Sequence, residues 1–534
     1  MIGAVDAKEA ARTTPPSLGG KPCETLKARR VTPVPDHSRP RPDLVLAQAL
    51  AADLDAADFR SDALRTLWGS EADDALARGL RAPILRALAD RDDPLSTLGR
   101  FWVLGMPQAL RVVERALPRT GIDGLVAMGL AAREDDRVAP LALITPQSFV
   151  DADGVGEWWI ASDLDEGALG GALPADHVLG VGGASRTLAE LVIPTPVERA
   201  LDLGTGCGIQ ALLVSRHAGA VVATDISERA LAYAELNAYL NGVRNIEFRL
   251  GSLFEPVAGE SFDLIVSNPP FVITPRVAGV PAYEYRDGGL IGDALVERFL
   301  REVPTHLSPG GVAQLLGNWE SSADVTGLDR VRSWVDDDLD AWVIQREELS
   351  PLGYAELWIR DGGTLPRDDE FTRLLTAWLD DFDHRGVTAV GFGYIVLRRP
   401  SAGAAVLRRF ETAAQPVTDL GRALGRGLQA HDALAHGVPE RLLVAPDVTE
   451  ARHFMPGEDD PSVIELRQGG GFGRTVRVDP ALAGLVGACD GELTVAQIVA
   501  ALADLFEVPL ADLWADLEPR LRELVLDGLL LPAE

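Results

Sequence analysis

The chain has 534 residues, of which 47% are apolar and 24% are charged, a composition typical of globular proteins. Its length exceeds what one hydrophobic core usually organises, so about three domains are expected. Acidic residues outnumber basic ones by 80 to 50, and the formal net charge of −30 disfavours a large surface for binding phosphate backbones.

The sequence carries no signal for a membrane or an oxidising compartment. No apolar run approaches the ~18 residues of a membrane-spanning helix, and the N-terminus lacks a secretory signal. The three cysteines, Cys23, Cys207 and Cys489, have neither paired nor metal-ligand spacing. We therefore expect reduced thiols, no bound metal, no membrane partner and a cytoplasmic location.

Residues 1–42 are predicted to be a disordered tail. They contain seven prolines and no sustained apolar period. Eight basic residues stand against four acidic ones, and so modest an excess disfavours a nucleic-acid-binding arm.

Residues 43–184 are predicted to form a mainly helical N-terminal domain. Apolar residues recur at spacings of three and four in the segments 44–50, 63–68, 82–88, 107–113 and 121–128. A charged turn at 133–137 and an apolar run at 138–144 follow, and two helices before such a wing are typical of a winged helix. Because residues 121–130 contain no basic side chain, a substrate-recognition or lid domain is favoured over a DNA-reading one.

The stretch around which the chain is organised begins at Ala200. An apolar run predicts a buried strand, and Gly204, Gly206 and Gly208 follow it before a helix starts at Ile209. A strand that turns tightly into a helix exposes backbone N–H groups at the carboxyl edge of a parallel sheet, where nucleotides bind. Three glycines alone also fit an ordinary tight turn, so the following strands decide the interpretation.

Those strands end in polar residues. Val221–Asp225 predicts a second strand ending in a carboxylate, from which ribose hydroxyls can be bound. A third strand is predicted to end at 248–252 and a fourth at 262–268. The fourth runs directly into the motif Asn268-Pro269-Pro270-Phe271.

With these residues the chain resembles the class I S-adenosylmethionine-dependent methyltransferases, and the motif belongs to those that methylate planar amide or exocyclic amine nitrogens. The resemblance implies a Rossmann-like α/β domain at 185–400, with seven strands of which the last is inserted antiparallel. Later strands are expected at 310–316, 341–346 and 391–397. S-adenosylmethionine is the implied cofactor, and its predicted binding residues are Asp202, Gly204, Thr205, Gly206, Gly208, Asp225, Ile226, Ser252, Leu253 and Asn268. Such enzymes usually have an acid at the position of Ser252, so adenine recognition is expected to use backbone N–H groups there.

The predicted catalytic residues are Asn268, Pro269, Pro270 and Phe271, and the chemistry explains their types. The Asn268 side-chain oxygen and the Pro269 carbonyl can each accept one N–H of an NH2 group, which aims the nitrogen lone pair at the methyl carbon. Proline has no backbone N–H and fixes the chain, while Phe271 offers a flat face to a planar substrate.

Residues 401–534 are predicted to form a small C-terminal domain. The segments 462–466 and 474–478 read as a hairpin, and the glycine-rich loop between them lacks the Lys-Ser/Thr of a phosphate-binding loop. Amphipathic helices are expected at 494–506 and 510–526. The pattern resembles a second winged-helix-like or peptide-binding module.

Within the Asn-Pro-Pro group, the chain most resembles the glutamine N5-methyltransferases that act on translation release factors. Phe271-Val-Ile-Thr-Pro275 is similar to their archaeal and eukaryotic branch, and Tyr285–Gly292 parallels their glycine-rich turn; the resemblance covers about 191–320. The first hypothesis for the acceptor is therefore a glutamine side chain in a protein, with a translation factor as the candidate partner. The alternatives are an RNA or DNA base nitrogen (adenine N6 or guanine N2) flipped against Phe271, as in base methyltransferases, and a catalytically idle partner-binding fold.

Overall fold

The computed structural model describes residues 39–151, 154–171, 173–277, 279–281, 286–413 and 419–533. Most of the predicted tail, with Cys23, lies outside these residues, as does Tyr285. Cys207 and Cys489 are buried free thiols, as expected. Among the described helices, none combines the length and the apolar character needed to cross a membrane.

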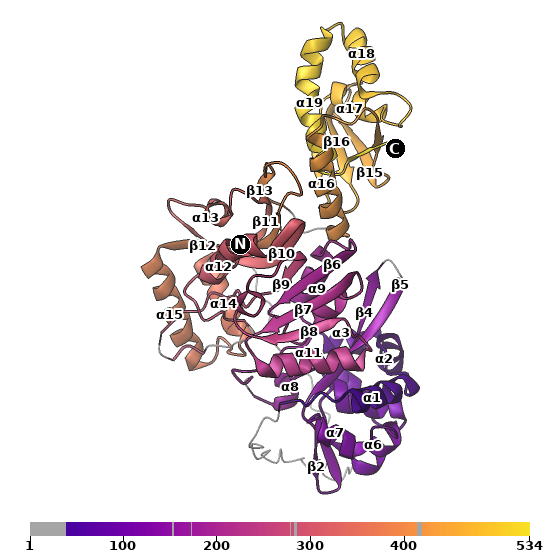
Figure 1. The fold of residues 1–534 in the computed structure, drawn as a ribbon, viewed down its shortest axis with the longest axis vertical. Coiled ribbons are helices and arrows are strands. Elements are labelled where there is room, and N and C mark those ends of the chain that lie inside the picture. The colour runs from indigo at the N-terminus through magenta and orange to yellow at the C-terminus, as the bar shows by residue number, and fades with distance from the viewer. Residues whose placement is uncertain are drawn as a thin grey trace, which may run out of the picture. The chain divides into compact units, whose positions relative to one another are not determined.

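An eight-stranded sheet forms the middle of the chain (Figure 1). Its strands, in the order in which they lie side by side, are β13 (Arg408–Thr412), β11 (Asp340–Leu349), β12 (Val387–Arg398), β10 (Leu307–Ser322), β9 (Phe262–Ser267), β6 (Val197–Leu203), β7 (Ala218–Asp225) and β8 (Ile246–Leu250). Strands β8, β7, β6, β9 and β10 are parallel, and β12 is antiparallel to both β10 and β11. The predicted mixed α/β domain with an antiparallel last strand is confirmed.

The seven strands predicted within 185–400 are present as β6 to β12, and the sheet contains one further strand. β13 pairs in parallel with β11 and extends the sheet beyond residue 400, the expected end of the domain. The pairing is possible because β11 would otherwise be an open edge. The proposed division of the chain into domains stays a prediction.

The central strands of this sheet are buried on both faces, whereas the edge strands β8 and β13 are only partly buried. Along β9, Leu264 and Val266 belong to one apolar cluster, whereas Ile265 belongs to another, as the period of two requires. The helices connected to the sheet are α9 (Gly183–Leu191), α10 (Ile209–Val214), α11 (Glu228–Leu240), η2 (Glu255–Val257), α12 (Ala294–Glu302), η3 (Val303–His306), α13 (Gly327–Trp334), α14 (Pro351–Asp361) and α15 (Asp369–Arg385).

The N-terminal part is mainly helical, as predicted. Its helices are α1 (Leu44–Ala56), α2 (Ser61–Trp68), α3 (Ser70–Leu76), α4 (Ala82–Leu88), α5 (Pro94–Leu98), η1 (Gly99–Val103), α6 (Leu110–Ala116), α7 (Gly121–Ala127) and α8 (Glu166–Leu169). The strands β1 (Gln108–Ala109), β2 (Ala131–Glu134) and β3 (Arg137–Pro140) form a sheet in the order β1-β3-β2, and β4 (Leu143–Asp151) pairs with β5 (Gly154–Ser162). The run at 107–113 is therefore part strand and part helix. The winged-helix interpretation stays a prediction.

This part shares a hydrophobic core with the helices of the large sheet. One apolar cluster contains Leu50 of α1 and Trp102 of η1 together with Leu212 of α10 and Tyr233 of α11. Cys207 lies in the same cluster, so its thiol is a packing group, and burial raises its pKa to about 11.

The C-terminal part has a core of its own. Its elements are α16 (Leu420–Leu434), β14 (Leu442–Val444), β15 (Val448–Phe454), β16 (Pro461–Gln468), β17 (Thr475–Val478), α17 (Pro480–Gly487), α18 (Val495–Phe506), α19 (Leu510–Leu526) and β18 (Leu530–Pro532). The predicted hairpin is confirmed, since Ile464 of β16 pairs with Val478 of β17. Both predicted helices are present, and Thr494 caps α18.

Candidate active site

The sheet brings the predicted site residues to one edge. Leu203, at the end of β6, pairs with Thr224 of β7 on one side and with Ser267 of β9 on the other. All three strands are parallel, so the segments that follow them leave the sheet at the same edge. The glycine loop, Asp225 and Asn268 are therefore neighbours, as the sequence predicted.

The glycine loop, Gly204 to Gly208, requires glycine for two different reasons. Gly204, Gly206 and Gly208 have φ values of 77°, 55° and 86°, in the left-handed region that favours glycine. A Cβ at Gly204 or Gly206 would meet open space, whereas one at Gly208 would lie 2.9 Å from the Cβ of Ala234 on α11. The first two glycines thus present bare backbone to an open space, and the third allows close helix packing.

Asp202 is buried directly beneath this loop, at 1% exposure. Its Oδ2 accepts hydrogen bonds from Thr205 Oγ1 at 2.6 Å and from the backbone N–H of Ala211 at 2.9 Å. Its Oδ1 is buried and has no hydrogen-bond partner among the residues that the structure describes. Burial raises the pKa of Asp202 to about 7. A buried oxygen without a hydrogen bond is unfavourable. A bound ligand that donates a hydrogen bond to it or carries positive charge would compensate for this.

Asp225 is held over the glycine loop by two backbone groups. The N–H of Gly206 donates to its Oδ2 and the N–H of Ser227 to its Oδ1, both at 2.9 Å. These two hydrogen bonds orient the carboxylate beside the loop. The next residue, Ile226, is 61% exposed and provides an apolar surface beside the carboxylate.

The loop after β8 has an unusual backbone. Leu253 has a φ of 46°, which is uncommon for a residue other than glycine, and such strain is concentrated at functional sites. The N–H of Gly251 donates to the carbonyl of Asp225 at 3.0 Å, which fixes this loop beside the end of β7. Within the described part of the chain, the N–H groups of Ser252 and Leu253 donate no hydrogen bond.

Asn268 follows β9 and is half-buried. Ser267 Oγ, just before it, donates to the carbonyl of Leu203 at 2.7 Å and joins the ends of β9 and β6. In the described residues the Asn268 side chain makes no hydrogen bond, so both its amide oxygen and its NH2 group remain available. Pro269, the next residue, is buried.

The segment after the motif is fixed by a second stretch of chain. Phe271 forms a single antiparallel bridge with Asp287, and the N–H of Val272 donates to the carbonyl of Arg286 at 2.8 Å. Asp287 in turn accepts hydrogen bonds from the guanidinium of Arg276 and from the N–H of Gly289. Asp287 thus shapes a turn.

Two buried polar residues near the segment that follows the motif were not predicted from the sequence. The hydroxyl of Tyr354, on α14, accepts a hydrogen bond from the N–H of Ile273, and Asn318, on β10, donates to the same hydroxyl. No local signal identifies them, because a tyrosine in an amphipathic helix reads as an ordinary core residue.

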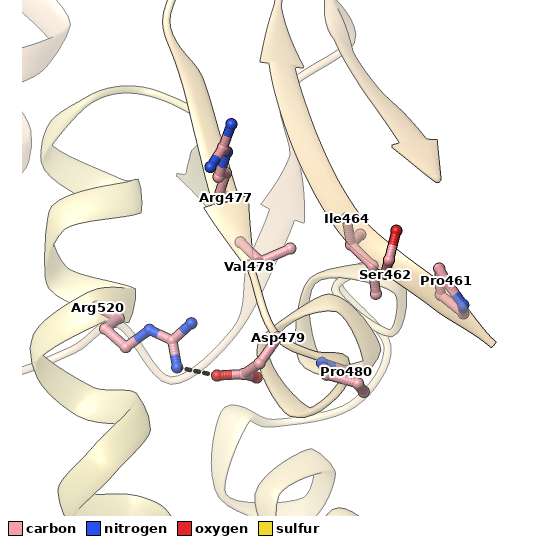
Figure 2. A pocket seen from close by; sticks show the side chains of 8 residues that line it. All are labelled: Pro461, Ser462, Ile464, Arg477, Val478, Asp479, Pro480 and Arg520. Carbon is pink, nitrogen blue, oxygen red and sulfur yellow. Dashed lines mark hydrogen bonds and ion pairs between the residues drawn. The ribbon is translucent and has the colours of Figure 1, made fainter. Parts of the chain in front are cut away.

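A pocket of about 570 Å³ in the C-terminal part contains none of the predicted site residues (Figure 2). It lies between the end of β17, the start of β16 and α19, and its two arginines already have acidic partners. Arg520 pairs with Asp479, as Figure 2 shows, and Arg477 lies 3.7 Å from Glu465. The strand edge around Asn268, not this pocket, is therefore the candidate active site.

Comparisons with known proteins agree with this assignment. Residues 180–330 match the family described as "Methyltransferase small domain", and residues 56–141 match a domain of unknown function, DUF7059. A putative sarcosine dimethylglycine methyltransferase structure from Galdieria sulphuraria, 19% identical over 41% of this chain and 84% of its own, gives a TM-score of only 0.27. The fold assignment therefore rests on the sheet order described above.

Three curated relatives are similar to this chain over the same region. The ribosomal protein uL3 glutamine methyltransferase of Bradyrhizobium diazoefficiens is 37% identical over 27% of this chain and 48% of its own length. The release factor glutamine methyltransferase of Xylella fastidiosa is 40% identical over 24% and 50%. The putative protein N5-glutamine methyltransferase of Methanocaldococcus jannaschii is 38% identical over 22% and 59%. The chain thus spans about half the length of the curated relatives it matches.

The site also fits the cofactor that the sequence implied. The bare glycine backbone faces open space. The buried Asp202 oxygen can accept a hydrogen bond from a ligand, and the unused N–H groups of Ser252 and Leu253 can donate hydrogen bonds to it. Residues 180–330 thus combine a match to the methyltransferase small domain family with the arrangement of strand ends described above.

Proposed function

We propose that this protein transfers a methyl group from S-adenosylmethionine to the side-chain amide nitrogen of a glutamine in another protein. The observation that carries the proposal is the position of Asn268. Its side chain lies at the end of β9, next to the glycine loop at the end of β6, and makes no hydrogen bond in the described residues. It is therefore available to an acceptor group.

Residues on three strand ends would hold the cofactor. The glycine loop gives close backbone approach, with Asp202 and Thr205 beneath it. The Asp225 carboxylate would accept hydrogen bonds from the ribose hydroxyls. Ile226 would cover one face of the adenine ring, and the N–H groups of Ser252 and Leu253 would donate hydrogen bonds to the edge of that ring. When bound, the cofactor supplies a methyl group already activated by its sulfonium.

The protein's task is then to orient the acceptor nitrogen. An NH2 group can donate one N–H to the Asn268 side-chain oxygen and the other to the Pro269 carbonyl. This leaves its lone pair directed toward the methyl group. Pro270 restricts the backbone that presents these oxygens, and the flat face of Phe271 suits a planar amide.

A protein acceptor is favoured over a nucleic acid by two findings. The curated relatives are named for glutamine in ribosomal protein uL3 or in a release factor, and the net charge of −30 disfavours a nucleic-acid substrate. We therefore expect a translation protein as partner and a cytoplasmic location. The winged-helix-like N-terminal part would contribute to acceptor recognition.

The test is methyl labelling of a cell extract. The purified protein is incubated with S-adenosylmethionine carrying a radioactive methyl group, with and without nuclease treatment, and Asn268→Ala serves as the control. We expect label in a protein band that survives both RNase and DNase and is lost with the variant. Label that disappears with nuclease would instead establish a base methyltransferase, and the absence of label with wild-type protein would indicate an idle fold.

A further inference from the structure

The segment that follows the Asn268–Phe271 motif is buried and is anchored by a side chain far away in the sequence. Val272, Ile273 and Thr274 are all buried. The N–H of Ile273 donates to the hydroxyl of Tyr354 at 3.0 Å, and Tyr354 is itself fully buried on α14. The motif is thus followed, within two residues, by a fixed point.

The same hydroxyl is joined to the sheet. Asn318 Nδ2 donates to it at 2.8 Å, and Asn318 is buried on β10. In the pairing of β10 with β9, Leu315 lies opposite Ser267, so Asn318 lies three residues further toward the edge that carries Asn268. One hydroxyl therefore joins the motif segment, the strand next to it and α14.

The position of the hydroxyl is set by aromatic packing. The ring of Tyr354 lies 6.0 Å from that of Trp378, 6.0 Å from that of Phe382 and 5.4 Å from that of Phe392, measured between centroids. Trp378 and Phe382 belong to α15, which together with α14 is inserted between the neighbouring strands β11 and β12. This helical hairpin thus forms a rigid support behind the motif segment.

The hydrogen bonds are consistent with a permanent link. Burial raises the pKa of Tyr354 well above its ordinary value, so the hydroxyl keeps its proton at neutral pH. Asn318 Oδ1 is buried without a partner in the described part of the chain. Exchanging the oxygen and nitrogen of that amide would reverse the hydrogen bond but would join the same two residues.

We propose that Tyr354 is a positioning residue for methyl transfer: its hydroxyl ties Ile273 to Asn318 and thereby fixes the orientation in which the Asn268 side chain and the Pro269 carbonyl meet the acceptor nitrogen. The inference rests on the proposed function, because the acceptor geometry matters only if a methyl group is transferred. Tyr354 acts through the backbone that follows the motif.

The test is Tyr354→Phe, which keeps the aromatic ring and removes only the hydroxyl. We expect turnover to fall roughly tenfold to a hundredfold, as small misplacements of reacting groups do, while KM for the acceptor and the Kd of S-adenosylhomocysteine stay unchanged. Exchange of the Ile273 amide hydrogen should become about tenfold faster, because its hydrogen bond is lost. Asn318→Ala, which removes the other partner of the hydroxyl, should give the same fall in turnover.

The matched control is Tyr239→Phe, which removes a hydroxyl bonded to Glu235 on the surface of α11. It should change neither turnover nor exchange at Ile273. Wild-type turnover with Tyr354→Phe would overturn the positioning role even if methylation itself is established. If the wild-type protein labels no acceptor, the proposed function fails and the role of Tyr354 fails with it. Unchanged exchange at Ile273 would show that the link does not hold the segment.

Discussion

Asn237 and Ala161 exchange two hydrogen bonds: the backbone N–H of Ala161 donates to Asn237 Oδ1 at 2.7 Å, and Asn237 Nδ2 donates to the Ala161 carbonyl at 2.9 Å. The same Nδ2 also donates to the carbonyl of Cys207 in the glycine loop, at 2.8 Å. A single side chain on α11 therefore forms hydrogen bonds both to a strand of the N-terminal part and to the glycine loop. Asn237 thus links the N-terminal part to the glycine loop.

Replacing this side chain should weaken both parts at once. Asn237→Ala leaves buried backbone groups without partners, and we expect the free energy of unfolding to fall by about 2–3 kcal/mol. The affinity for S-adenosylhomocysteine should fall as well, because the Cys207 carbonyl loses its donor. Urea unfolding and calorimetric titration measure the two effects. Asn268→Ala is the control, since that side chain makes no hydrogen bond to the described residues and its loss should leave stability unchanged.

The glycine loop predicts opposite results for two similar substitutions. Gly206→Ala places a Cβ into open space and should cost only about 1 kcal/mol of stability, from its positive φ, while cofactor binding is lost. Gly208→Ala forces a Cβ against Ala234 and should mainly destabilise the fold. Thermal unfolding and S-adenosylhomocysteine binding distinguish them. Equal losses of stability in the two variants would contradict this division of roles.

The raised pKa of Asp202 predicts a pH dependence of stability. Because burial raises this pKa from 3.8 to about 7, the folded protein binds more protons than the unfolded chain within that window. The contribution of Asp202 to the free energy of unfolding should therefore fall as the pH rises from 3.8 to about 7 and stay level above it, by roughly 4 kcal/mol at most. Urea unfolding at several pH values checks this.

Asp202→Asn isolates the effect. The difference in unfolding free energy between variant and wild type should change through that window. A constant difference for Asp202→Asn would show that its carboxyl is ionised throughout.

The C-terminal part should depend on one half-buried carboxylate at the edge of the sheet. Glu411 of β13 accepts hydrogen bonds from Arg474 at 2.8 and 3.0 Å and from Trp342 Nε1 at 2.7 Å. Burial opposes its ionisation, but the arginines outweigh burial and lower its pKa. Glu411→Ala leaves half-buried guanidinium groups short of a partner and should destabilise the protein by about 3 kcal/mol. Glu450→Ala, which breaks an ion pair with Arg452 on β15, should cost under about 1 kcal/mol in the same urea titration.

The central sheet could be predicted because its signals are local. Most of the seven expected strands are apolar runs, and the polar residues that end them, such as Asp225 and Asn268, belong to motifs with fixed spacing. β13 escaped prediction because Arg408-Arg-Phe-Glu-Thr412 carries no apolar run, and its charged side chains have partners in distant segments of the chain. The site residues on strand ends were therefore accessible to sequence reasoning, and the eighth strand was not.

The residues that support the site were not accessible for a related reason. Tyr354 lies 81 residues after Ile273, and their contact depends on how α14 packs. Asn237 reads as one polar residue in an apolar helix, and nothing in the sequence pairs it with Ala161. Contacts between distant segments leave no periodic trace in a single chain.

The most direct test of the whole account is to locate the transferred methyl group. The labelled acceptor is digested, and fragmentation mass spectrometry identifies the modified residue. We predict one added methyl group on the side-chain nitrogen of a glutamine, present with wild-type protein and absent with Asn268→Ala. A methyl group on a nucleobase, on a lysine or arginine, or on glutamine in equal amount with Asn268→Ala would contradict the account.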